Sequence, residues 1–421
     1  MTTFLRSALQ PFRALSRPAR LFLLALFLDG LLFSGWNLFF NLYILRAGYS
    51  RDFLGLINSA PSLSALLLGV PMGLLSDRIG RKPAMLLGFT LANLGIIALI
   101  LARTEAVMLA MALFWGAASQ LYVLSQAPFM MKTSDDKTRD LLFSVSFGMF
   151  PLASTLGNFL AGFLPGLFGR LSGTPDTPWV YQAVLLTSVV GSFFVLVPLA
   201  LVHEPEGPTL SPWADPDSVR PPSLWKALSR PLTLKLALPN LILGFGAATL
   251  IPYFNVFFAT RYAMSDANLG VLFSLGSLLI GIGCLVGPHL VGNLGGRVRT
   301  VVLGEAASLV FLLAIGFSPW LWLAVVGYLV RGVLMNVVSP FFDAFALEQS
   351  SVSEHGMVTS IRNLAWNVGW AVGPFVSGLV QQRWGFQPLF VNTAVLYTLA
   401  IGITWLYFRP SANQPPHATP A

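Results

Sequence analysis

Twelve apolar segments, each about as long as a helix that crosses a lipid bilayer, constrain the fold of this 421-residue chain more than any other feature. A helix needs about 20 consecutive apolar residues to span the hydrocarbon core of a membrane. Each segment therefore predicts a membrane-spanning helix. The segments lie near residues 21–45, 53–75, 83–102, 106–131, 141–168, 179–202, 232–260, 269–292, 299–318, 320–345, 357–382 and 387–408.

The composition excludes most other classes of protein. Hydrophobic residues make up 55% of the chain, charged residues make up 10%, and the mean hydropathy is +0.72. Such a chain cannot cover a soluble globule with polar surface. The net charge is +8, but the basic residues are spread over short loops, which argues against a nucleic-acid partner. Metal-ligand spacing, a phosphate-binding loop and a nucleophile elbow are all missing from the sequence, so we expect neither an enzyme nor a cofactor.

The basic residues indicate which loops face the cytoplasm. Lys and Arg are concentrated on alternate loops, with eighteen on one set of loops and termini and six on the other. Cytoplasmic loops of membrane proteins carry this excess of positive charge. We therefore expect both termini in the cytoplasm and a multi-pass protein of a plasma membrane. Five Lys against twenty Arg favour a prokaryote, and hence its inner membrane.

The two halves of the chain repeat each other with an offset of about 215 residues. The stretch that starts at Asn41 corresponds to the stretch that starts at Asn255, and Gly157 corresponds to Gly373. This repeat predicts two pseudo-symmetric six-helix bundles in an all-α membrane protein. We expect the first bundle at 1–203, a cytoplasmic linker at 204–224, the second bundle at 225–410 and a disordered tail at 411–421.

A short charged turn between the second and third segments carries the most specific motif. Asp77 lies between two glycines and is followed by basic residues, whereas a loop that obeyed only the charge rule would need neither the acid nor the glycines. The motif resembles the loop between helices 2 and 3 of the major facilitator superfamily of secondary transporters, where it acts in the conformational switch. Its residues here are Gly73, Asp77, Arg78, Gly80, Arg81 and Lys82. The second copy of the turn is degenerate, with Gly292 in place of the acid.

This resemblance implies twelve helices, a central cavity faced by helices 1, 4, 7 and 10, and alternating access. Within the family, the chain is closest in style to the proton-coupled efflux permeases, which use the proton gradient as their energy source. It departs from the familiar drug exporters because its fourth helix lacks the usual Arg. Trp115 stands at the position that corresponds to Arg331 in the other half. This departure argues against drug/proton antiport of the familiar kind, unless Asp29 and Arg331 divide the coupling role differently.

Asp29 and Arg331 are the candidate residues for proton coupling. A charge near the centre of a membrane helix costs about 2.5–3.5 kcal/mol on insertion scales, and such residues usually have a function. Asp29 follows Arg20 by nine residues and therefore lies roughly 13 Å deep. We expect its carboxyl group to take up and release a proton, although a purely structural carboxylate would also fit.

Arg331 lies roughly 16 Å deep on the tenth segment and needs an acidic partner. Asp29 and Glu305 are the available acids. The family resemblance favours Asp29 or a group on the substrate, because helix 9, which carries Glu305, usually packs at the periphery of the fold.

Aromatic and amide side chains on the cavity-facing helices predict the substrate site. Aromatic faces with few charges suit an amphipathic organic solute, and rings together with Asp29 favour a cation. For any single aromatic residue, packing in the core or at an interface is the commoner role. The candidate cavity residues are Trp36, Asn37, Asn41, Trp115, Gln120, Tyr122, Tyr253, Asn255, Asn336, Trp366 and Asn367.

We therefore expect a secondary active transporter that moves a small amphipathic organic solute by proton-coupled efflux. Its partners would be a small-molecule substrate, protons and membrane lipid, and the chain would act as a monomer. Two alternatives remain on sequence grounds: an uptake symporter or facilitator for a sugar-like solute, and a lipid translocase.

Overall fold

The computed structural model describes residues 15–135, 137–174, 177–203, 230–291, 296–350 and 355–409, without the side chains of 284–291 and 356. Every regular element in these ranges is a helix. The expected linker at 204–224, the tail at 411–421 and the degenerate turn at Gly292 lie outside the described residues.

Within the described residues the first bundle has six spans, two of which are built from more than one helix. The first span joins α2 to α3, and the sixth joins α8 to α9 through the short 3₁₀ helix η1. The bounds are α2 Arg17–Leu32, α3 Ser34–Arg46, α4 Arg51–Ile79, α5 Arg81–Leu101, α6 Glu105–Thr133, α7 Arg139–Ser172, α8 Pro178–Ser192, η1 Phe193–Val195 and α9 Leu196–Leu201.

The second bundle repeats this plan, with its first span again broken. That span runs through α11, the 3₁₀ helix η2 and α12. The bounds are α11 Pro231–Leu250, η2 Ile251–Tyr253, α12 Phe254–Arg261, α13 Asp266–Val291, α14 Arg297–Phe317, α15 Leu321–Glu348, α16 His355–Trp384 and α17 Gln387–Phe408.

The breaks in the two first spans have local causes. In the first bundle, the Ser34 hydroxyl donates to the Gly30 carbonyl at 2.6 Å, a contact that bends helices. In the second bundle, Pro252 has no backbone N–H and therefore cannot continue the helical hydrogen bonding, so the chain forms η2. The second break lies at the contact between the bundles, where Asn41 of the first bundle donates to the Pro252 carbonyl.

Eleven of the described spans are apolar enough to cross a membrane by length and composition. The twelfth, α16, is long enough with 30 residues, but it carries polar groups such as Arg362 and Asn367 along its length. This polarity has a structural reason, because α16 helps to line a cavity. The expected all-α fold is confirmed.

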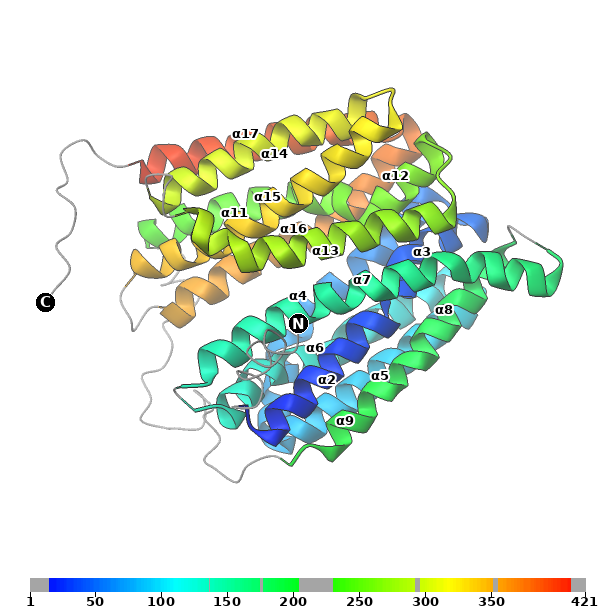
Figure 1. Ribbon diagram of the computed structural model, residues 1–421, viewed down its shortest axis with the longest axis horizontal. Helices are drawn as coiled ribbons and strands as arrows, with labels where there is room; N and C mark the ends of the chain where they lie inside the picture. Colours follow the sequence, from blue (N-terminus) through cyan, green and yellow to red (C-terminus); the bar gives the residue numbers. More distant parts are fainter. Residues whose placement is uncertain are drawn as a thin grey trace, which may run out of the picture.

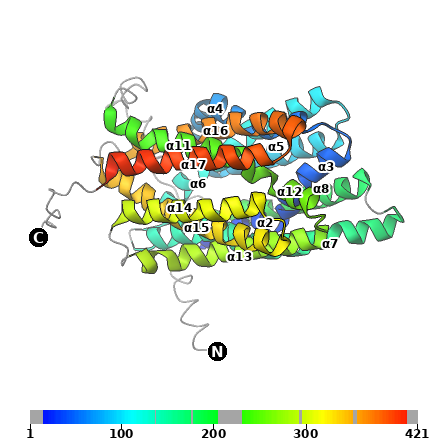
Figure 2. The same cartoon turned by 90° about the horizontal axis from the view of Figure 1, so that it is seen from above.

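The two bundles lie side by side and meet toward one end of the molecule (Figure 1). The start of α2 and the end of α17 both lie at the end of the molecule opposite this meeting point, and we call it the termini end (Figures 1 and 2). We call the end where the bundles meet the distal end. Close helix pairs connect the bundles, with α4 against α16 and α7 against α13. Gly55 lies against Gly378, and Gly162 lies against Gly270, where a Cβ would collide with the facing backbone.

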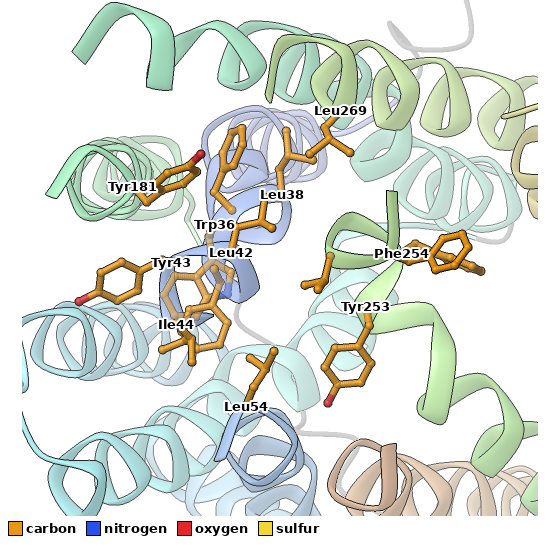
Figure 3. Packing of buried hydrophobic residues seen from close by; sticks show 14 of the residues in the cluster. Trp36, Leu38, Leu42, Tyr43, Ile44, Leu54, Tyr181, Tyr253, Phe254 and Leu269 are labelled. Atoms are coloured by element: carbon orange, nitrogen blue, oxygen red, sulfur yellow. The ribbon is translucent and has the colours of Figure 1, made fainter. Parts of the chain in front are cut away.

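The largest core cluster belongs to both bundles and surrounds this contact. It contains residues of α3 and α4 together with Tyr253, Phe254 and Leu269 of the second bundle. Figure 3 shows these side chains approaching one another from the two sides. Burying large apolar side chains contributes about 1.5–3 kcal/mol each, so the cluster stabilises the closed distal end.

Candidate functional site

A cavity of about 520 Å³ lies in the second bundle. Its walls come from α11, α12, α13, α14, α15, α16 and α17, together with η2. Along α15 it extends from Tyr328 to Asp343, a rise of about 22 Å. The Asp343 side chain is 59% exposed and lies five residues from the end of α15 at the termini end, so it marks the outer part of the cavity.

Arg331 is the deepest charged residue of this cavity on α15. It is only 5% exposed, and its Nη2 donates to the hydroxyl of Tyr397 at 3.1 Å. Its guanidinium carbon lies 5.7 Å from the ring centroids of both Phe254 and Tyr397, a cation–π arrangement. Among the described residues, Arg331 forms no ion pair, and its Nε has no hydrogen-bond partner.

Glu305 of α14 lines the same cavity and is also 5% exposed. Its Oε2 has no hydrogen-bond partner within the described structure. Glu305 and Arg331 both interact electrostatically with Tyr397, but they are not close enough to form an ion pair. The structure therefore places Glu305, rather than Asp29, in one cavity with Arg331.

A second arginine lies nearer the termini end. Arg362 of α16 is 5% exposed, and its Nη2 donates to Asp343 Oδ1 at 2.8 Å. Its guanidinium carbon lies 4.8 Å from the centroid of the Phe342 ring. The Arg362 carbonyl accepts a long hydrogen bond of 3.4 Å from Asn240. The cavity thus contains two arginines and two carboxylates, of which only one pair is in contact.

Aromatic rings form much of the remaining wall. Phe254 lies edge-on to Tyr328 at 5.4 Å between centroids, and Trp366 lies 6.3 Å from Trp370. Of the expected cavity residues, Trp366 and Asn336 line this cavity. Asn367 is half-buried on the same helix as Trp366 but is not part of the lining.

Asp29 lies in the first bundle, away from the cavity lining. It is partly buried on α2, and its carboxylate makes no hydrogen bond or ion pair with any described residue. Tyr122 of α6 lies within electrostatic range of it. The Tyr122 hydroxyl is buried without a hydrogen-bond partner, and its ring packs at 5.2 Å from Phe89. The structure thus brings Asp29 close to Tyr122 and does not pair it with Arg331.

The other expected cavity residues of the first bundle differ in how deeply they are buried. Trp36 is 3% exposed, stacks on Phe40 at 4.2 Å and meets Trp115 edge-on at 5.4 Å. Asn37 is exposed, whereas Trp36 and Leu38 on either side of it in α3 are buried. Gln120 is partly buried on α6.

Asn41, Asn255 and Tyr253 lie in the contact between the bundles. Asn41 Nδ2 donates to the Pro252 carbonyl at 2.6 Å, and Asn255 Nδ2 donates to the Leu38 carbonyl at 2.8 Å. Each asparagine therefore binds the carbonyl three residues before its counterpart, and we call the two residues the asparagine pair. The Tyr253 hydroxyl donates to the Pro374 carbonyl of α16 at 3.0 Å.

Further polar contacts join the bundles near the distal end. The Tyr181 hydroxyl donates to Asp266 Oδ2 at 2.7 Å, and Ser274 donates to the Thr155 carbonyl at 2.7 Å. The backbone N–H of Phe375 donates to Ser59 at 2.9 Å. These contacts, together with the close approaches of Gly55 to Gly378 and of Gly162 to Gly270, close the distal end in this state.

The charged turn between α4 and α5 is a compact ion-paired structure. Arg81 pairs with Asp77 and donates to the Ser76 hydroxyl at 2.9 Å. Gly80 adopts φ 91°, which a residue with a side chain rarely reaches. Lys82 donates to the Ala200 carbonyl at 2.7 Å and so connects the turn to α9. Gly73 approaches α6 beside Leu124, whereas Arg78 is exposed.

Sequence reasoning did not place Arg362, Glu305 or Tyr397 in the cavity. Arg362 is one of the eighteen basic residues that the charge pattern assigns to the cytoplasmic side, although an arginine seven residues inside α16 beside an asparagine is a detectable signal. Glu305 was recognised as an intramembrane acid but ranked below Asp29. Nothing in the sequence distinguishes Tyr397 from other aromatic residues, because its contact with Arg331 depends on where α17 lies after it has packed against α11 and α14.

Comparisons with known proteins agree with this architecture. The family model of the Major Facilitator Superfamily matches residues 22–304 and 293–421. The multi-drug resistance efflux pump PmrA of Streptococcus pneumoniae is 23% identical over 84% of this chain and 86% of its own length. The synaptic vesicular amine transporter of Bos taurus is 24% identical over 86% of this chain and 67% of its own length.

Solved structures share the fold. A bacterial homologue of the human lysosomal transporter Spinster, solved in an inward-facing and occupied conformation, has a TM-score of 0.74 at 13% identity and covers 93% of this chain and 95% of its own. The nucleoside transporter NupG has a TM-score of 0.71 at 14% identity and covers 94% of this chain and all of its own. Because the family model matches almost the whole chain, the protein belongs to the Major Facilitator Superfamily, a family of transporters.

Proposed function

We propose that this protein is a secondary active transporter that moves a small amphipathic organic solute by alternating access, with proton-coupled efflux as its mode. The observation that carries the proposal is the combination of a closed distal end with a polar and aromatic cavity in the second bundle. A site of this size suits a drug-sized solute. Relatives that include an efflux pump and amine transporters support the class of activity.

The direction of the open side follows from the charge pattern. We propose that the termini end faces the cytoplasm, which the basic residues favour, and that the described state is closed toward the outside. A solute would then enter from the cytoplasm and leave after the distal contacts open. The proposed location is the inner membrane of a prokaryote, with the chain acting as a monomer.

Asp29 is the proposed proton carrier. Its carboxylate lies in a membrane span without a hydrogen-bond partner among the described residues, beside the unpartnered hydroxyl of Tyr122. Arg331 belongs to the other bundle, so we propose that the proton and the solute use separate sites that are coupled by the movement of the bundles. One proton crossing about 100 mV supplies about 2.3 kcal/mol, roughly a 50-fold solute gradient.

A transport assay in proteoliposomes tests this coupling. With an imposed pH gradient, the wild-type protein should move an amphipathic solute against its gradient. Asp29→Asn should abolish the uphill movement but retain downhill exchange, because the amide cannot carry a proton. Asp140→Asn is the matched control, since Asp140 is an exposed carboxylate at the start of α7 and should be dispensable.

If Asp29→Asn keeps full pH-driven transport, Asp29 is not the proton carrier. A flux that ignores the pH gradient in both proteins would indicate a facilitator, the second mode that the sequence left open. Sugar-like solutes in the same panel separate that mode from efflux of amphipathic molecules.

A further inference from the structure

We propose that the cavity of the second bundle binds an amphipathic organic anion, with an aromatic or other apolar body and one carboxylate-like group directed to Arg331. This inference rests on the proposed transport function and names the class of its solute. It differs from the cation that Asp29 and the aromatic residues favoured on sequence grounds.

The cavity contains more unused hydrogen-bond donors than acceptors. Seven buried side-chain nitrogen or oxygen atoms in the described residues have no partner, and four of them belong to residues that line this cavity. Three are donors, namely Arg331 Nε, Arg362 Nε and Trp370 Nε1, and one is an acceptor, Glu305 Oε2. Buried polar groups are almost always satisfied, so this concentration indicates a ligand rich in acceptor atoms.

Arg331 has the buried charge and the unused N–H donors that such a ligand would satisfy. Its side chain uses one of its five N–H donors, in the hydrogen bond to Tyr397, and no described carboxylate neutralises it. A buried charge without a counter-ion is costly. The planar guanidinium matches the two oxygens of a carboxylate in a bidentate pair, whereas an ammonium ion would be repelled.

The two arginines of the cavity differ in whether a carboxylate neutralises their charge. Arg362 already has a counter-ion in Asp343 at 2.8 Å, so it contributes a local hydrogen-bond donor without an unmet charge. The unmet positive charge is therefore at Arg331, in the deep part of the cavity. Aromatic residues surround that position, and Phe254 and Tyr328 offer ring faces and edges to an apolar body.

Glu305 sets a condition on anion binding. Its carboxyl group faces the same cavity, so an ionised Glu305 would repel an anion at Arg331 or compete with it for the guanidinium. The solute anion is therefore bound most readily when Glu305 carries a proton. Glu305→Gln should consequently preserve anion binding or strengthen it, the opposite of its effect on a cation.

Three naphthalene solutes with the same ring and different head groups test the charge preference: 2-naphthoate, the neutral 2-naphthamide and 2-naphthylmethylammonium. Binding is measured by isothermal titration calorimetry on the purified full-length protein in detergent at neutral pH. We expect naphthoate to bind about tenfold or more tightly than the other two, because it alone forms a charge-assisted pair with Arg331. In Arg331→Gln the advantage of naphthoate over naphthamide should disappear while the amide still binds.

Retained amide binding shows that Arg331→Gln is folded, and Arg383→Gln provides an arginine control outside the cavity. Equal affinities across the wild-type series, a preference for the ammonium solute, or no binding of any of the three would overturn the proposal without any variant. A naphthoate preference that survives in Arg331→Gln would overturn it as well. Because the assay measures binding and not transport, the protein can fail it and still pass the proteoliposome test.

Discussion

At the scale of single residues, the charged side chains within the membrane spans have different surroundings. Asp29 and Arg331 are conspicuous because a charge in an apolar segment is costly wherever the segment packs. Their neighbours depend on the arrangement of distant helices. Arg331 contacts Tyr397 and the Phe254 ring, and it shares a cavity with Glu305. The sequence ranked Glu305 below Asp29 as the partner of Arg331, because helix 9, which carries Glu305, usually packs at the periphery in this family.

The contact between Tyr397 and Arg331 gives a stability prediction. Tyr397→Phe keeps the ring but removes the acceptor of the only hydrogen bond that Arg331 makes among the described residues. We expect a loss of about 0.5–1.5 kcal/mol in the free energy of unfolding, measured by denaturation in detergent. Tyr407→Phe is the control on the same helix, because Tyr407 is 45% exposed, and it should change stability by less than about 0.5 kcal/mol. Equal effects of the two substitutions would contradict the assigned role of the hydroxyl.

At the scale of helices, the apolar segments predicted the spans well, and the observed helix ends differ from the predicted ones by a few residues. The predicted segment 141–168 corresponds to α7, Arg139–Ser172. The breaks within the first and seventh spans were not predicted, because they depend on Ser34 bonding and on Pro252 in an otherwise apolar run. The repeat had already matched Asn41 to Asn255, but their reciprocal hydrogen bonds appear only when the bundles are placed together.

The asparagine pair should stabilise the closed distal end. Asn41→Ala removes its hydrogen bonds to Pro252 and Asn255, each worth about 1 kcal/mol, and should raise the population of the distal-open state about fivefold or more. The reporter is a cysteine at Ala161, a residue 4% exposed beside the Gly162 crossing, in a Cys284→Ser background. An impermeant maleimide should label it faster in the variant.

Asn93→Ala is the matched control for that experiment. Asn93 is also buried and hydrogen bonded, but its partners Phe89 and Ser192 lie in the same bundle. Its removal should leave the labelling rate unchanged. If Asn41→Ala and Asn93→Ala accelerate labelling equally, the effect is general loosening, and the asparagine pair does not close the distal end.

At the scale of the whole molecule, the internal repeat predicted two similar bundles, and the described fold has them. The sequence could not predict which end is closed, because that depends on contacts between the bundles such as Tyr181 with Asp266. It also could not predict that the described cavity lies in the second bundle alone. The two halves share an ancestral pattern of helices, whereas the charged residues Glu305, Arg331 and Arg362 occur in only one of them.

The central claim is that the bundles alternate between two states, and spin-label distances across them test it most directly. One pair of labels replaces Trp179 and Trp384, exposed residues of opposite bundles at the distal end; a second pair replaces Leu74 and Ser360, exposed residues of α4 and α16 toward the termini end. Double electron–electron resonance is recorded in lipid over a pH series, in the Cys284→Ser background. We predict that the distal distance lengthens as the termini-end distance shortens, because one rigid-body movement changes both. Distances that stay constant, or that lengthen together, would contradict alternating access.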